Sequence, residues 1–220
     1  ATVPVLAREL RRRATDVVLL TTHHATLMFA PPAARLAGAG LVLGLHQTGG
    51  KAIGIPSFPR HSVEGAFLLD ALVVLTRAQV DYLRAEEGFL RFPWRRAPVA
   101  VIPNGVDIPP PATVDDRADA RRRLGLEADD LAVGIVAALR PEKDHDLLLR
   151  AVSRLAGEFP ALRLVLIGSR ARDAELRAGA ARLGIDGRTV FAGFRPDAVQ
   201  LVRGLDVACL VSVQETFPTS

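Results

Sequence analysis

The stretch "LAVGIVAALRPEKDHDLLLRAVSRL", residues 131–155, reads as a strand, a turn and a helix in direct succession. Residues 131–139 are small or apolar on both faces of an extended chain, which is typical of a buried strand in a parallel sheet. After the turn, apolar residues recur at the i, i+3, i+4 and i+7 positions of one helical face. These are Leu148, Ala151, Val152 and Leu155. The stretch therefore predicts a β-α unit whose helix packs against the sheet.

The same alternation continues in both directions along the chain. Short apolar runs are separated by amphipathic segments that are typical of helices. The runs lie at 16–20, 41–45, 72–75, 99–102, 131–139, 162–168, 189–194 and 206–213. Repeated β-α-β units predict an α/β fold with parallel sheets, since the crossover between parallel strands needs a helix.

The composition is that of an ordinary globular protein. The chain has 220 residues, of which 49% are hydrophobic and 24% charged, enough for a sizeable core. No apolar run approaches the roughly 20 residues that span a bilayer, and the start lacks the apolar centre of a secretory signal. Cys209 is the only cysteine and lies in an apolar run, which predicts a buried, inert thiol. Cytoplasm is the expected location.

The net charge of +4 does not by itself indicate nucleic-acid binding. The arginines are spread along the chain and few aromatic residues accompany them, so we expect no nucleic-acid partner. Lys51 and Lys143 are the only lysines, which points to a compositional drift toward arginine.

The composition changes once, at "NGVDIPPPATVDDRADA", which begins at Asn104. Asn-Gly and three consecutive prolines continue neither a helix nor a central strand. We therefore place a domain boundary near 106–115 and expect two domains, residues 1–105 and 106–220. Both are expected to be incomplete, because the first opens on a helix without a preceding strand and the second holds four strands only.

Ligands of open parallel sheets bind beyond the carboxyl ends of the strands. Arg140 follows the run 131–139 and Lys143 lies at the start of the next helix, so two cations and main-chain N–H groups converge there. This arrangement is that of a diphosphate site in outline. The alternative is two solvated cations that balance the acids Glu142, Asp144 and Asp146.

Other strand ends also carry polar residues. His46 ends "LVLGLH" and precedes Gly49 and Gly50, although a single histidine at a strand end is often structural. His23 and His24 are expected to end another strand, where neighbouring side chains point to opposite faces and make a poor metal pair. Glu215 follows "DVACLVSV", and a carboxylate there can accept hydrogen bonds from two sugar hydroxyls, with a simple surface acid as the alternative.

Several functional motifs are absent from the sequence. None of the strands is followed by Gly-x-Gly-x-x-Gly, and there is no Walker motif, Gly-x-Ser-x-Gly or His-Glu-x-x-His. No Asp-x-Asp follows a strand, so a metal-held sugar nucleotide is not indicated and we expect no metal site.

Four motifs occur in order between residues 99 and 220: "VIPNGVD", "ALRPEKDHDLLLRAV", "VFAGF" and "QETFP". Together they resemble the donor-binding domain of the family 4 glycosyltransferases. That family comprises retaining enzymes with the GT-B fold, in which two Rossmann-like domains face each other across a cleft. The resemblance implies an enzyme, a hexosyltransferase that uses a nucleotide sugar and needs no cofactor.

The resemblance also implies roles for individual residues. Arg140 and Lys143 match the residues that hold the donor diphosphate, and Glu215 matches the first acid of a Glu-seven residues-Glu motif that binds the donor sugar. His46 matches a histidine beside the reacting sugar. The remaining matches are the main chain of Thr216, Phe217 and Pro218 near sugar and phosphate, Phe194 and Arg195 near the base, and His23 or His24 on the acceptor side.

Two departures from the family pattern stand out. The usual Lys-Gly is Lys143-Asp144 here, and the usual Gly after the first acid is Thr216. The Gly-rich loop at the start and the second acid, due three residues beyond Ser220, are not in the chain. We therefore expect a piece truncated at both ends that is inactive alone.

The expected donor is a UDP- or GDP-sugar, and the acceptor is a glycan, a lipid-linked molecule or a small molecule. Basic character would suit peripheral contact with the inner face of the membrane, and the arginine drift explains it equally well. The alternatives are a non-catalytic nucleotide-binding module or degenerate fragment, and a GT-B sugar-nucleotide epimerase. Base, sugar, acceptor and oligomeric state do not follow from the sequence.

Overall fold

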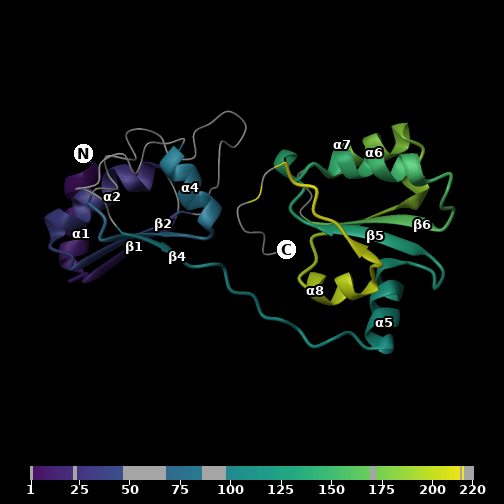
Figure 1. The fold of residues 1–220 in the computed structure, drawn as a ribbon, viewed down its shortest axis with the longest axis horizontal. Coiled ribbons are helices and arrows are strands. Elements are labelled where there is room, and N and C mark those ends of the chain that lie inside the picture. Colours follow the sequence, from purple (N-terminus) through teal and green to yellow (C-terminus); the bar gives the residue numbers. More distant parts are fainter. Residues whose placement is uncertain are drawn as a thin grey trace. The chain divides into compact units, whose positions relative to one another are not determined.

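The computed structural model describes residues 2–21, 24–46, 68–85, 98–168, 172–213 and 215. Contacts divide the chain into two compact units, Ala1–Val106 with Gln214–Thr219, and Asp107–Val213 with Ser220. Each unit has its own four-stranded sheet, and all pairings are parallel (Figure 1). The predicted α/β fold with two Rossmann-like sheets is confirmed.

Every apolar run that we predicted to be a strand overlaps one. The first unit consists of α1 (Thr2–Arg12), β1 (Val17–Thr21), α2 (His24–Ala37), β2 (Leu41–His46), β3 (Ala71–Val74), α4 (Arg77–Ala85) and β4 (Val99–Val101). The second consists of α5 (Val114–Leu124), β5 (Leu131–Val136), α6 (His145–Leu155), β6 (Leu162–Ile167), α7 (Asp173–Arg182), β7 (Thr189–Gly193), α8 (Ala198–Leu201) and β8 (Val207–Ala208). Short 3-10 helices lie at Pro141–Lys143, Asp186–Arg188 and Val202–Gly204.

The sheet of the first unit has the order β1-β2-β3-β4. Its core includes Ala30 and Ala34 of α2, which pack with Leu20, Val42 and Leu72 of the strands. The half-buried leucines of α1, Leu6 and Leu10, pack against the same cluster. The apolar face of α1 is therefore used within this unit.

The sheet of the second unit has the order β7-β6-β5-β8. The chain moves outward from β5 to β6 and β7, then returns to the other side of β5 to form β8. The point where the order reverses thus lies between β5 and β8, and in open α/β sheets this is where ligands bind.

Helices cover both faces of the second sheet (Figure 1). Helices α6 and α7 cover one face, where Leu148, Leu149 and Leu176 pack against Leu164 and Leu166. Helices α5 and α8 lie on the other face, and their core residues are Leu124 and Leu201, with Ala132, Val165 and Ile167 of the strands. This three-layer arrangement explains why the strands are apolar on both faces.

The segment 102–113 between the units forms neither helix nor strand, as its prolines predict. Helix α5 then begins with a capping box, in which the Thr113 hydroxyl accepts from the Asp116 N–H and the Asp116 carboxylate accepts from the Thr113 N–H. The division falls between Val106 and Asp107. That one unit serves the acceptor and the other the donor stays a prediction.

Two predicted strands are shorter by several residues in the structure. β5 ends at Val136 and not at residue 139, and β8 ends at Ala208 and not at residue 213. Within the run 206–213, Val207 and Ala208 alone pair with β5, because the chain leaves the sheet soon after the Cys209 N–H donates to the Gly134 oxygen at 2.7 Å. An apolar run predicts burial, but pairing decides where a strand stops.

Candidate functional site

The segments that follow β5 and β8 come together at the reversal point of the second sheet. The chain after β8 runs to Val213, whose N–H donates to the carbonyl oxygen of Glu142 at 2.9 Å. Glu142 belongs to the turn after β5, which carries both predicted cations. We call Arg140–Asp144 the cation turn.

The cations of this turn differ in their surroundings. Arg140 has a side chain 68% exposed, and its guanidinium Nη1 lies 3.8 Å from Glu142 Oε1. Lys143 is half-buried. An ion pair this long and exposed contributes little to stability, so the Arg140 guanidinium can bind another anion at low cost.

Asp144 links the cation turn to helix α6. Its main chain is left-handed, with φ 43°, and its carboxylate accepts from the Leu147 N–H at 3.1 Å as the N-cap of α6. The chain after β5 therefore forms a 3-10 turn at Pro141–Lys143 and then α6, because the left-handed Asp144 interrupts the helical path. The positive φ of Asp144 also explains the glycine that the family pattern has at this position, since glycine adopts positive φ without strain.

Asp146 lies in the first turn of α6 and turns its charge toward helix α7. Its carboxylate pairs with Arg172 at 2.9 Å, and Arg172 also pairs with Glu175. These two acids raise the pKa of Arg172 above its ordinary value, mainly through the hydrogen bond to Glu175. Of the three acids that were expected to balance the cations, Asp144 and Asp146 are thus bonded to other groups of the protein, and Glu142 lies 3.8 Å from Arg140.

Sequence reasoning missed His145, the first residue of α6. Its side chain is completely buried, and both ring nitrogens lack a hydrogen-bond partner among the described residues. The available signal was its position three residues before Leu148, which places a polar residue on the apolar stripe of the helix.

Phe194 and Arg195 lie at the carboxyl end of β7, the outer strand beyond β6. Phe194 is 73% exposed. The Arg195 guanidinium is held by Asp197 through two hydrogen bonds, at 2.9 and 2.8 Å. The Arg195 side chain is therefore already bonded to Asp197, and the main chain of Arg195 is the part that can contact a base.

The structure places the remaining predicted residues only in part. His46 is the last residue of β2 and pairs in register with Val74, but its side chain lies outside the described part. His24 begins α2, so the prediction that it ends a strand was wrong: β1 stops at Thr21. Glu215 is half-buried and groups by its contacts with the first unit, and it does not directly follow a strand as predicted. His23, Thr216, Phe217 and Pro218 lie outside the described residues.

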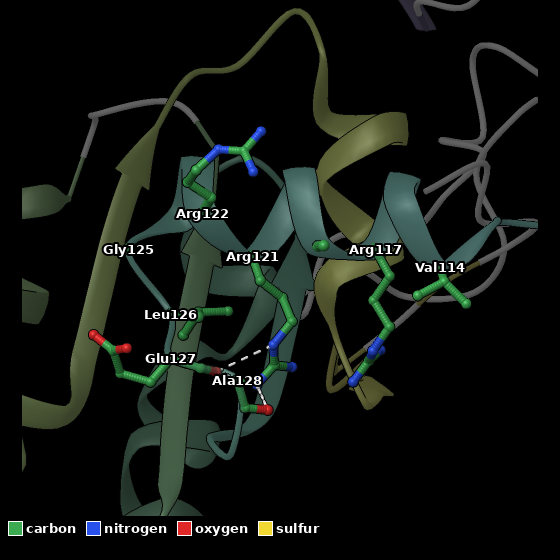
Figure 2. A pocket seen from close by; sticks show the side chains of 9 residues that line it. Val114, Arg117, Arg121, Arg122, Gly125, Leu126, Glu127 and Ala128 are labelled. Atoms are coloured by element: carbon green, nitrogen blue, oxygen red, sulfur yellow. Dashed lines mark hydrogen bonds between the residues drawn. The ribbon is translucent and has the colours of Figure 1, made fainter.

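A separate pocket of about 480 Å³ lies beside helix α5. Arg117, Arg121 and Arg122 line it together with residues 125–128 (Figure 2). Residues 125–128 precede β5, so this pocket belongs to the amino-end side of the sheet, opposite to the cation turn. None of our predicted site residues lines it.

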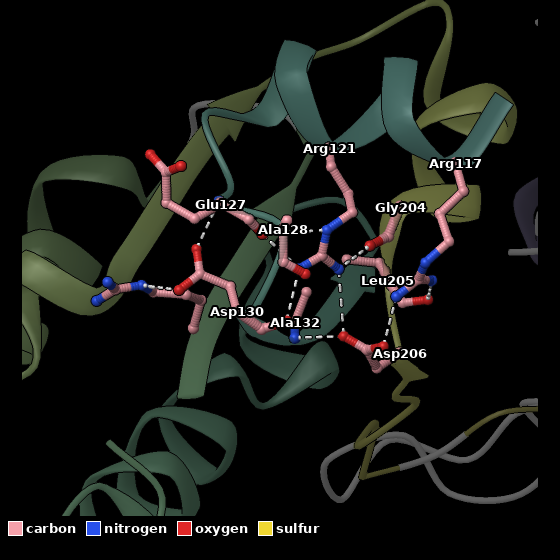
Figure 3. Close-up of polar contacts among 10 residues, drawn as sticks. Arg117, Arg121, Glu127, Ala128, Asp130, Ala132, Gly204, Leu205 and Asp206 are labelled. Carbon is pink, nitrogen blue, oxygen red and sulfur yellow. Dashed lines mark hydrogen bonds and ion pairs between the residues drawn. The ribbon is translucent and has the colours of Figure 1, made fainter. Parts of the chain in front are cut away.

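The Arg121 guanidinium beside this pocket is a structural group. It is buried and donates to the carbonyl oxygens of Glu127, Ala128, Asp130 and Gly204 and to the Asp206 carboxylate (Figure 3). The Asp206 carboxylate also accepts from the Ala132 N–H, at a distance of 2.7 Å. This bond is drawn in Figure 3 as well. These bonds join α5 to the starts of β5 and β8, so the pocket's central arginine has no capacity left for a ligand.

Burial by itself would raise the pKa of Asp206, but the Ala132 N–H and the guanidinium groups of Arg117 and Arg121 lower it below its ordinary value overall. The carboxylate is therefore charged at neutral pH and complements the cations around it. The cluster supports the fold of the second unit at the end away from the reversal point.

Residues 116–220 match the family of glycosyl transferases group 1. The second unit of the chain is therefore similar to the glycosyl transferases of group 1. The D-inositol 3-phosphate glycosyltransferase of Stackebrandtia nassauensis is 36% identical over 163 residues, which cover 67% of this chain and 34% of that protein. The enzyme of the same name from Mycobacteroides abscessus is 30% identical over 155 residues, with 67% and 33% covered. The predicted resemblance to glycosyltransferases is thereby confirmed, and the chain spans about a third of the length of these relatives.

Solved structures agree on the fold of the chain. Anabaena Alr3699/HepE, crystallised with UDP and glucose, superposes with a TM-score of 0.74 at 22% identity, covering 97% of this chain and 58% of that one. A glycosyltransferase from Rickettsia africae superposes with a TM-score of 0.72 at 14% identity, covering 97% and 55%. None of the helices in the described ranges has the length and hydropathy of a bilayer-spanning segment.

Proposed function

We propose that the protein is a retaining glycosyltransferase that moves a hexose from a nucleotide sugar to an acceptor, with the donor bound at the cation turn. The observation that supports this most is the bond between Val213 and Glu142 at the reversal point of the second sheet. It ties the segment leading to Glu215, two residues further on, to the turn that carries Arg140 and Lys143.

The proposed chemistry follows from the charges of the cation turn. When the bond between sugar and phosphate breaks, negative charge builds up on the departing diphosphate. Arg140, Lys143 and the positive end of the α6 dipole stabilise that charge, and this lowers the barrier because the charge is largest in the transition state. A carboxylate from Glu215 orients the sugar by accepting from its hydroxyls.

The other predicted residues take secondary roles in this proposal. Phe194 and the main chain of Arg195 lie beside the base, and the main chain of Thr216 to Pro218 approaches the sugar and phosphate. His46 lies beside the reacting sugar. His23 or His24 lines the acceptor side.

The relatives suggest the classes of donor and acceptor. A UDP-sugar donor is supported by the Anabaena protein, which was crystallised with UDP and glucose. A small phosphorylated acceptor is supported by the name D-inositol 3-phosphate glycosyltransferase. A glycan or a lipid-linked acceptor, the latter with peripheral contact at the inner face of the membrane, is the second choice, and a GDP-sugar is the second choice of donor.

The test uses the protein made from its complete reading frame. UDP- and GDP-sugars are screened for thermal stabilisation, and the best donor is then assayed with inositol 3-phosphate and other acceptors. Arg140→Ala is expected to lower kcat roughly a hundredfold, because one charged group that stabilises the leaving diphosphate is lost. Arg150→Ala, on the exposed side of α6, is the matched control.

Two outcomes would favour the alternatives. Nucleotide binding without transfer to any acceptor, unchanged by Arg140→Ala, would indicate a non-catalytic binding module. Interconversion of UDP-sugars without an acceptor would indicate an epimerase. The prediction that residues 1–220 alone do not turn over is tested by the same assay on that segment.

A further inference from the structure

His145 is the polar end of an otherwise apolar stripe. Helix α6 buries His145, Leu148, Leu149 and Val152 on one face, against the sheet of the second unit. The imidazole is 0% exposed, and neither Nδ1 nor Nε2 has a hydrogen-bond partner among the described residues. Leucine at this position would continue the stripe without burying two unpaired nitrogens.

The ring is held in its neutral form. Burial is the main cause that lowers the pKa of His145 below 6.5, and the positive charges of Arg172 and Lys143 lower it further. The carboxylates of Asp146 and Asp144 oppose this, but the net shift is downward. A neutral imidazole carries one N–H donor and one acceptor nitrogen, so His145 can donate to an anion while it remains uncharged.

Two unpaired nitrogens in the interior have a cost. A buried polar group without a partner destabilises a fold, and such groups in native proteins usually have a functional reason. Position suggests the reason here. His145 lies two residues after Lys143 and directly after Asp144, whose left-handed main chain forms the end of the cation turn.

We propose that His145 is a positioning residue of the donor site, whose ring gains its missing hydrogen bond when the cation turn closes on the donor diphosphate. The ring N–H then donates to a phosphate oxygen, directly or through one ordered water, and so holds the turn in its bound form. This inference rests on the proposed function, since it takes the diphosphate to lie against the first turn of α6. Because the ring gains its hydrogen bond in the closed turn, donor binding favours the closed form of the turn.

The test compares His145→Leu with His145→Asn and His145→Gln in the full-length protein. Removing unpaired nitrogens should raise the melting temperature of the ligand-free Leu variant. The same variant should bind UDP roughly ten- to a hundredfold more weakly, as expected for one lost hydrogen bond to a charged group. The donor KM should rise in parallel, while the acceptor KM stays unchanged.

The two amide variants identify the nitrogen involved. Asparagine places its NH₂ group near the position of Nδ1, and glutamine places it near that of Nε2, so the variant that restores UDP affinity marks the donating atom. A structural role alone would be indifferent to this choice. Restoration by either one supports the proposal.

Three results would overturn it. A lower ligand-free melting temperature for His145→Leu would mean that the ring already has a partner. Unchanged UDP affinity in that variant would mean that His145 contributes only to packing. If neither amide restores affinity, the ring contributes through its shape and not through a hydrogen bond. The proposed function fails in a different way, because the wild-type protein would then show no stabilisation by UDP or UDP-sugars.

Discussion

The main-chain N–H of Val213 donates a 2.9 Å hydrogen bond to the carbonyl oxygen of Glu142. The two residues follow β8 and β5, which are neighbours in the sheet although they lie far apart along the chain. The bond therefore holds the segment before Glu215 against the cation turn.

Val213→Pro is expected to raise the donor KM about three- to tenfold, because proline has no N–H and one hydrogen bond is lost. Val213→Ala keeps the N–H and should behave as wild type. Steady-state kinetics with the donor varied at saturating acceptor measure the effect. Equal donor KM values for the two variants would show that the bond does not position the segment.

Substitutions of Asp144 separate its two roles, the left-handed main chain and the N-cap. Asp144→Ala loses the cap and strains the main chain, so its free energy of unfolding should fall by about 1–2 kcal/mol. Asp144→Gly loses the cap but relieves the strain, and should fall by a few tenths of a kcal/mol. Asp144→Asn keeps both features. Urea unfolding measures all three, and an Ala variant as stable as the Asn variant would contradict the assignment.

Arg121→Met should destabilise the second unit by about 3 kcal/mol, because it leaves Asp206 and several carbonyl oxygens without their buried partner. Arg122→Met is the matched control, since the Arg122 side chain is 72% exposed and should contribute less than about 0.5 kcal/mol. Chemical unfolding followed by circular dichroism distinguishes them. Similar losses in both variants would mean that the Arg121 network adds nothing beyond surface charge.

The pH dependence of stability should report on His145. Its pKa in the folded protein is below the ordinary 6.5, so between these values the unfolded chain binds a proton that the folded chain does not. The free energy of unfolding should therefore decline as the pH falls below about 6.5. His145→Leu should lack this part of the slope, while the carboxylates affect both proteins alike at lower pH. Parallel curves down to pH 5 would show that the ring does not titrate as described.

Removal of divalent metals is expected to leave transfer activity intact. Arg140, Lys143 and the start of α6 supply the positive charge that a metal would otherwise contribute at the diphosphate. Activity is measured after treatment with EDTA. Loss of activity that Mg²⁺ or Mn²⁺ restores would show that the cation turn is not sufficient.

The strands were predictable because their signal is local. A run such as 162–168 is apolar on both faces whatever lies beside it, and the resulting strand, β6, is indeed central in its sheet. The end of β8 was not predictable, since the residues after Ala208 are equally apolar and only the partner strand decides how far pairing extends. The prediction that His24 ends a strand was wrong for a related reason. No change in the apolar pattern marks the place where β1 ends and α2 begins.

The two cations of the proposed donor site were predictable from the sequence, but the contacts that hold the cation turn in place were not. Arg140 and Lys143 follow a recognisable strand and precede a recognisable helix, so their position at the carboxyl end needs only local pattern and the rule for parallel sheets. Asp144 as a left-handed cap, Asp146 as the partner of Arg172, and the burial of the His145 ring all depend on contacts with other segments.

The amino-acid sequence by itself determined the α/β class, the positions of the strands, the break before α5 and the two cations of the proposed donor site. These follow from residue chemistry and short-range periodicity. Only the tertiary structure decided that β8 returns to the side of β5, that Val213 bonds to Glu142, and that His145 is buried without a partner. Strand order and burial arise from contacts between distant segments, and no local pattern of residues encodes them.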